Sequence, residues 1–236
     1  MIRRAAIACV FLALLGVAPP SPWLQLDSQL VLQRYATALN ALDEPKAMIF
    51  SYSVSQLGPA NIEQRHRIYR SGTQVRDELI AIDGVAPRTK IVTITRREDR
   101  YAIGRLAPRD TAYTFLFLRA HQHGGHLDYE YETTPIVRST SGFIVERVTI
   151  DGARFLPHVI RFQSRRAGSY GNGALEYGSF GAYWMPVAAT VTATVDGHPA
   201  REHIAWGEYR FPASLPDATF VAPRALPATS SPSDLE

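Results

Sequence analysis

The sequence predicts a mainly β fold, a half-open antiparallel barrel of about ten to eleven strands with one N-terminal helix packed on or over its concave face. First, apolar and polar side chains alternate through most of residues 46–220, which is the period of a strand with one buried and one wet face. Second, Ser-Gly and Asp-Gly pairs separate several of these segments, as in antiparallel hairpins. Because most strands expose one face, the pattern favours an antiparallel meander over a parallel sheet covered by helices.

The helical pattern lies ahead of the strands, at residues 28–42. Asp27 or Ser28 can cap it, because their side-chain oxygens accept hydrogen bonds from the N–H groups of the first turn. Apolar side chains then follow at helical spacing on one face, and this stripe consists of Leu32, Tyr35, Ala36 and Leu39. The stripe has to be buried, and the rest of the chain offers only sheet.

Two strands carry conspicuous aromatic stripes. Met48, Phe50 and Tyr52 alternate with serines in the first predicted strand, and a later strand presents a second stripe of Tyr113, Phe115 and Phe117. Such side chains fill a core by default. One short helix cannot cover the concave face of an open barrel, however, so we expect part of that face to line a cavity for an alkyl chain. The other strands are expected at residues 62–69, 75–82, 91–96, 101–105, 127–131, 143–150, 155–162, 187–195 and 200–211.

The N-terminus predicts export. Arg3 and Arg4 precede an apolar run at residues 5–17, which is the layout of a signal peptide, here assigned to residues 1–20. Cys9, the single cysteine, lies inside that run, so the chain is not expected to be a lipoprotein. The domain is expected at residues 26–220, followed by a disordered Pro- and Ser-rich tail at residues 221–236. The predicted location is periplasmic or secreted.

Charge and motifs argue against nucleic-acid binding and catalysis. The formal net charge is +3, and removing Arg3 and Arg4 leaves 3 − 2 = +1, without a basic stripe that would follow a phosphate backbone. The chain has no Gly-x-Ser-x-Gly nucleophile elbow. The glycine-rich segment at residues 168–173 is interpreted as a loop between strands and not as a phosphate cradle. We therefore predict no enzymatic activity, no cofactor and no nucleic-acid partner.

A histidine-rich segment offers an alternative chemistry. His121, His123 and His126 lie within six residues, around two glycines and next to carboxylates at Asp128 and Glu130. Imidazole and carboxylate ligands suit zinc or a similar divalent ion, and the glycines would let the rings converge. The competing interpretation is a flexible, solvated hairpin loop.

Scattered segments resemble one known family. They are Tyr-Arg-Ser-Gly-x-x-Val-Arg at residues 69–76, the segments at 155–162 and 183–187, and a closing Leu-Pro-x-x-x-Phe at 215–220. Together with the strand rhythm, they resemble the LolA/LolB-like fold of periplasmic lipoprotein-sorting and carrier proteins, which RseB/MucB-type regulators share. The resemblance implies a concave apolar face that binds acyl chains and a lid helix, here with Leu32, Tyr35 and Leu39. It also implies that strand arginines hold the lid, and Arg70 and Arg76 are the nearest matches.

We therefore predict an exported, non-catalytic binding or carrier protein for a lipid, acyl chain or lipoprotein in the cell envelope. Membrane contact is expected to be transient at most, and an envelope protein partner is possible. The alternatives are a metal-binding envelope protein that uses the histidine segment, and a protein-interaction module that senses envelope state. The expected cavity residues are Met48, Phe50, Tyr52, Arg70, Arg76, Tyr113, Phe115 and Phe117.

Overall fold

The computed structural model describes residues 26–58, 61–98, 101–137, 142–166, 169–195 and 198–221. The expected signal peptide and residues 222–236 of the expected tail lie outside these ranges, as do the expected turn residues 196–197. No helix in the described ranges is both long enough and apolar enough to span a membrane.

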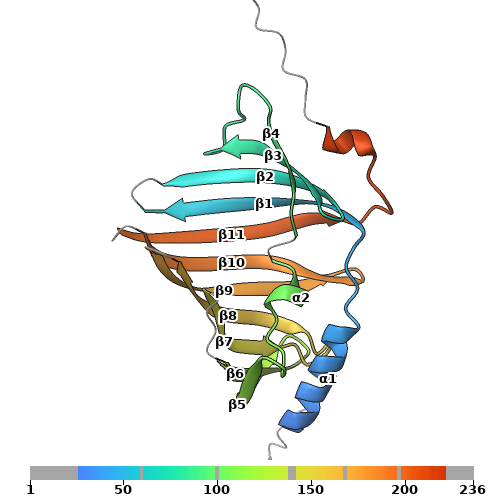
Figure 1. The fold of residues 1–236 in the computed structure, drawn as a ribbon, viewed down its shortest axis with the longest axis vertical. Coiled ribbons are helices and arrows are strands. Elements are labelled where there is room, and N and C mark those ends of the chain that lie inside the picture. The colour runs from blue at the N-terminus through green and yellow to red at the C-terminus, as the bar shows by residue number, and fades with distance from the viewer. Residues whose placement is uncertain are drawn as a thin grey trace, which may run out of the picture.

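Eleven strands form one antiparallel sheet in the order β4-β3-β2-β1-β11-β10-β9-β8-β7-β6-β5. Every strand pairs with its neighbour in sequence except at one place, between β4 and β5, and the first strand pairs with the last. The sheet is therefore a meander that opens at a single seam, as Figure 1 shows, and the prediction of a mainly β, half-open fold is confirmed. The strands are β1 Ala47–Leu57, β2 Ile62–Ser71, β3 Gln74–Ile82, β4 Ile91–Arg96, β5 Tyr113–His123, β6 His126–Pro135, β7 Phe143–Ile150, β8 Pro157–Arg166, β9 Ser169–Phe180, β10 Tyr183–Val195 and β11 His198–Arg210.

The N-terminal helix α1 (Ser28–Asn40) begins where the sequence predicts. The Asp27 side chain caps it by accepting hydrogen bonds from the backbone N–H groups of Gln29 and Leu30. Its buried face is Val31, Tyr35 and Leu39, a strict four-residue spacing. The buried face is therefore rotated slightly about the helix axis relative to the expected stripe. Leu32 lies at the edge of this face and is half-buried.

Helix α1 lies at the β5–β8 end of the curved sheet, and the short helix α2 (Ile103–Leu106) crosses the same face nearer the middle (Figure 1). One hydrophobic cluster joins both helices to the sheet. Its buried members are Val31, Tyr35, Leu39, Ile103, Ala107, Tyr129, Tyr131, Val145, Val148, Ile150, Leu156, Ile160, Leu175, Tyr177, Ala189, Ile204 and Trp206. The face that both helices cover is the concave face.

Two local predictions were wrong. The expected strand at residues 101–105 is a turn followed by α2, because this connection leaves the sheet at β4 and buries Ile103 in the core instead of pairing. Of the expected glycine-rich loop at 168–173, residue 168 lies outside the described ranges, and residues 169–173 form the start of β9. Gly173 pairs with Phe162 on β8 and with Val191 on β10. The glycine therefore allows neighbouring strands to pack closely and does not form a turn.

The chain after β11 returns to the far end of the sheet. A single 3₁₀ turn, η1 (Asp217–Phe220), lies beside β3. The guanidinium of Arg76 donates to the carbonyl oxygens of Thr219 and Val221, at 2.8 and 3.3 Å between the donor nitrogen and each oxygen. Arg76 thus ties the C-terminal segment to the third strand.

Candidate functional site

The concave face is built from one side of each strand and is strongly aromatic. On β1 the even-numbered side chains Phe50, Tyr52 and Val54 face it, while the odd-numbered Ser51 bonds to Glu208 on the opposite, convex face. Alternation therefore delivers the predicted aromatic stripes to one surface. Half-buried side chains that pack on the core here are Phe50, Tyr52, Val54, Tyr113, Phe115, Phe117, Phe143 and Phe162.

Helix α1 is held on this face by packing and by hydrogen bonds. Tyr35 is 2% exposed, its ring packs edge-to-face on Phe115, and its hydroxyl donates to the carbonyl oxygen of Pro108 at 2.8 Å. The hydroxyl of Tyr131 on β6 donates to the carbonyl oxygen of Ser28, also at 2.8 Å. Burial raises the pKa of Tyr35, so this hydroxyl stays protonated and able to donate.

A polar group interrupts the apolar surface on β1–β3. The ring of Tyr52 stacks on His66 with 4.7 Å between centroids, and its hydroxyl donates to Asp77 at 3.3 Å. The Nδ1 atom of His66 lies 2.7 Å from the other carboxylate oxygen of Asp77. Burial, followed by the charge of Asp77, raises the pKa of Tyr52. The sequence patterns did not indicate this group, because its members come from three separate strands.

A small hollow lies between the α1–β1 connection, α2 and the start of β10. It measures about 20 Å³, roughly the room of one water molecule. Met48 and Arg70 line it together with Trp184, and one nitrogen of Arg70 lies 3.7 Å from Glu44, just after α1. Arg70 is thus placed on the concave face at the base of the helix connection.

The predicted cavity residues do not all share this face. Met48, Phe50, Tyr52, Arg70, Tyr113, Phe115 and Phe117 do, with Met48 almost fully buried. Arg76 does not: its neighbours on β3, Val75 and Asp77, point to the concave side, so Arg76 points to the convex side, where it pairs with Glu78. Arg76 therefore does not hold α1, which is the role that the family resemblance implies for it.

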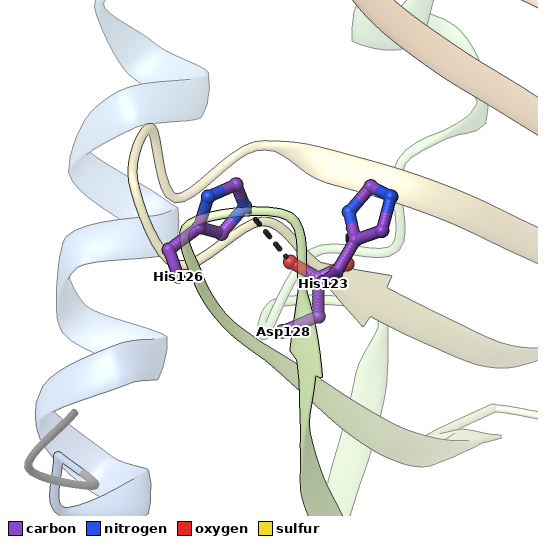
Figure 2. A group of neighbouring side chains, drawn as sticks. All are labelled: His123, His126 and Asp128. Carbon is purple, nitrogen blue, oxygen red and sulfur yellow. Dashed lines mark ion pairs between the residues drawn. The ribbon is translucent and has the colours of Figure 1, made fainter. Parts of the chain in front are cut away.

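The histidine segment is a tight hairpin with an exposed turn. Gly124 and Gly125 alone form its turn, and His121 and His123 belong to β5 while His126 opens β6. Figure 2 shows the imidazoles of His123 and His126 on either side of the Asp128 carboxylate. The donor atoms of these three residues lie within 4.8 Å of one another, and His121 is not part of the group.

Two further residues complete the cluster, and the sequence analysis did not assign them to it. His158 on β8 places Nδ1 2.7 Å from Asp128 Oδ2, and its ring stacks on His123 with centroids 4.4 Å apart. Asp151, directly after β7, places Oδ2 2.7 Å from His126 Nε2. They were missed because pairing of β6, β7 and β8 brings together residues about 30 positions apart in sequence.

Electrostatics keep the central carboxylate ionised. Burial works to raise the pKa of Asp128, but the hydrogen bond from His158 and the nearby imidazoles outweigh it and hold that pKa below its ordinary value. The same hydrogen bond raises the pKa of His158. Asp128 is therefore a buried anion that needs positive charge around it.

A second hollow lies where β6 and β7 diverge beyond Glu132. It measures about 490 Å³, and half of its lining residues are charged, namely Glu132, Glu146, Arg147 and Arg161. These charged groups do not suit an acyl chain.

No family model matches the chain, and no curated protein matches it. Among the solved structures to which the chain is similar are three for which the covered share is given first for this chain and then for the other. They are a LolA superfamily protein from Nitrosomonas europaea (14% identity, 84% and 99% covered, TM-score 0.45), a putative outer membrane lipoprotein-sorting protein domain from Vibrio parahaemolyticus (15%, 82% and 97%, 0.47), and a DUF1329 family protein from Desulfovibrio piger (12%, 82% and 96%, 0.46).

The first structure is named as a member of the LolA superfamily, and the second is described as a lipoprotein-sorting domain. At identities of 12–15%, the similarity concerns the fold alone.

Proposed function

We propose that the protein is an exported, non-catalytic carrier that binds an apolar or acyl-bearing ligand on the concave face of its sheet, with α1 as a lid. The observation that carries the proposal is the row of half-buried aromatic side chains left on that face after both helices have packed. A sheet that closes onto a core would bury such side chains fully. Here the seam between β4 and β5 leaves the surface open along one side.

The ligand site has to form by displacement of α1. The hollow at the base of the helix has room for about one water molecule, far less than an acyl chain occupies. Space of the required size arises where Val31, Tyr35 and Leu39 now pack. The protein then has a closed form, in which α1 packs on the sheet as it does in this structure, and an open form with the helix released.

The burial free energies of α1 and of an acyl chain are similar enough for the ligand to replace the helix on the concave face. The three buried side chains of α1 stabilise the closed form by about 1.5–3 kcal/mol for each large one. An acyl chain contributes about 0.8 kcal/mol for each CH₂ group that it buries, so roughly ten buried groups offset release of the helix. Ligands with shorter chains are expected to bind weakly.

A pair of adjacent variants tests the proposal. Phe115 faces α1 on the concave side, whereas Leu116 beside it is 63% exposed on the convex side. Phe115→Ser is expected to weaken binding of a fluorescent C16 fatty-acid probe by about tenfold or more, since several CH₂ contacts are lost. Leu116→Ser, the matched control, should bind as the wild type does.

Native mass spectrometry of the detergent-free protein adds a second measurement, because a carrier is expected to retain lipid from its host. Circular dichroism of both variants checks folding. Absence of retained lipid together with absence of probe binding to the folded wild type would remove the carrier proposal. Equal loss in both variants would place the ligand elsewhere.

A further inference from the structure

We propose that His123, His126 and Asp128 form a binding site for a divalent transition-metal ion of the zinc class, at the tip of the β5–β6 hairpin. The site is separate from the concave-face proposal and stands without it. Its three donor atoms converge from the two arms of one hairpin, held in register by ten pairs of residues between the strands. The short turn at Gly124 and Gly125 brings the two arms back to one point.

The distances fit a tetrahedral ion. Zinc binds imidazole nitrogen and carboxylate oxygen at about 2.0–2.1 Å, so two ligand atoms on one tetrahedral edge lie about 3.3 Å apart. His126 Nε2 lies 3.2 Å from Asp128 Oδ1, and His123 Nδ1 lies 3.4 Å from Asp128 Oδ2. Each imidazole thus lies at about the edge length from one oxygen of Asp128, and the two contacts go to different oxygens of that carboxylate. A single ion bound by both imidazoles and one of these oxygens requires the donor atoms, which now lie within 4.8 Å of one another, to close slightly.

Two buried atoms of the cluster have ion-pair contacts but no hydrogen bond. His126 Nε2 and Asp128 Oδ1 are both shielded from solvent, yet neither forms a hydrogen bond with any described residue. His126 Nε2 has carboxylate oxygens at 2.7 and 3.2 Å, but the angles do not suit a hydrogen bond. Leaving buried polar atoms unsatisfied costs about 1–3 kcal/mol each, and a metal ion placed between them would satisfy both.

Two surrounding residues, His158 and Asp151, contact the proposed ligands and hold them in place. The Nδ1–H of His158 donates to Asp128 Oδ2 at 2.7 Å, which fixes the carboxylate that would bind the ion. Asp151 uses Oδ1 to accept from the backbone N–H groups of Ala153 and Arg154, which leaves Oδ2 facing His126. With Asp128 it supplies negative charge that a divalent ion would balance.

The donor set also selects the kind of ion. Two imidazoles and one carboxylate suit zinc, copper or nickel, whereas magnesium and calcium prefer oxygen ligands alone. Three protein ligands leave a fourth position on the tetrahedron. The His123 side chain is 53% exposed, so the ion can enter from solvent on that side.

The test is calorimetry with zinc chloride at pH 7 on untagged protein that has been dialysed against EDTA. We expect one zinc ion per chain. Asp128→Asn and His123→Ala should each weaken binding at least tenfold, and His158→Gln should weaken it about tenfold to a hundredfold through the carboxylate that it orients. His123→Ala removes a half-exposed side chain, so folding should survive even if Asp128→Asn disturbs it.

His121→Ala is the matched control, because His121 lies two residues before His123 on the same strand but outside the converging group. It should bind zinc as the wild type does. The visible spectrum of the Co²⁺-loaded protein provides a second readout, which should show a tetrahedral ion that Asp128→Asn changes. If the wild type binds no zinc, or if His121→Ala abolishes binding while Asp128→Asn leaves it intact, the proposal is overturned and the cluster is a set of ion pairs.

Discussion

At the scale of single residues, the convex face holds a charge group that secures β3 and the C-terminal segment. Glu78 is 6% exposed and lies 2.6 Å from a guanidinium nitrogen of Arg76 and 3.0 Å from the Lys90 ammonium. Burial works to raise the pKa of Glu78, but the hydrogen bonds and charges of Lys90 and Arg76 outweigh it, and the pKa lies below its ordinary value of 4.5.

This shift predicts how stability depends on pH. A depressed carboxyl pKa contributes stability above about pH 4.5, and that contribution is lost as the pH falls through the lower pKa of the folded state. Glu78→Gln should therefore lower the free energy of unfolding at pH 7 by about 1–3 kcal/mol. Below pH 4.5 the difference from the wild type should shrink.

Urea unfolding from pH 7 to pH 3 checks the prediction. Glu132→Gln, which removes one exposed carboxylate on β6, is the control for a change of net charge. A difference between Glu78→Gln and the wild type that stays constant over this range would contradict the role given to the ion pair.

At the scale of elements, β9 depends on a glycine that the sequence suggested was part of a loop. A Cβ atom on Gly173 would lie 2.6 Å from the carbonyl oxygen of Thr190 and 2.9 Å from the ring of Phe162. The ring of Phe162 in turn stacks on Phe143 with 4.8 Å between centroids. The glycine thus makes room for an aromatic pair on the concave face.

Gly173→Ala should lower the free energy of unfolding by about 1–3 kcal/mol, because the backbone oxygen of the neighbouring strand cannot move aside cheaply. Gly207→Ala on β11 is the matched control: nothing lies within 4 Å of the Cβ it would add. We expect that variant to be neutral or slightly stabilised. Thermal melts of the two variants decide the matter, and equal melting temperatures would contradict the packing account.

At the scale of the whole molecule, the lid function requires α1 to leave while the sheet stays intact. The strands on both sides of β10 hold its backbone in two antiparallel ladders, whereas among the described residues α1 has no backbone-to-backbone hydrogen bond to the sheet. Local opening should therefore cost less for the helix than for the central strand.

Amide exchange in α1 (Ser28–Asn40) is accordingly expected to be faster than in β10 (Tyr183–Val195), and to change when lipid is added. Tyr35→Phe removes the hydrogen bond to Pro108, which is worth about 1 kcal/mol, and should speed exchange in α1 further while leaving β10 unchanged. Strong and equal protection in both elements, unaffected by lipid, would identify a fixed core helix and argue against a carrier.

The periodic elements of this protein could be predicted from local sequence patterns. Alternation on β1 and β5 predicted which side chains share a face, and Asp27 with the apolar spacing of α1 predicted the helix, because these patterns depend on backbone geometry within a few residues. Which side chains become neighbours across the strands could not be predicted in this way and follows from the folded sheet. It turned Arg76 away from Arg70, made the segment before α2 leave the sheet, and set His158 and Asp151 beside Asp128. Such neighbours depend on pairing between distant strands, and no local pattern encodes that register, because the partners meet only once the sheet has formed.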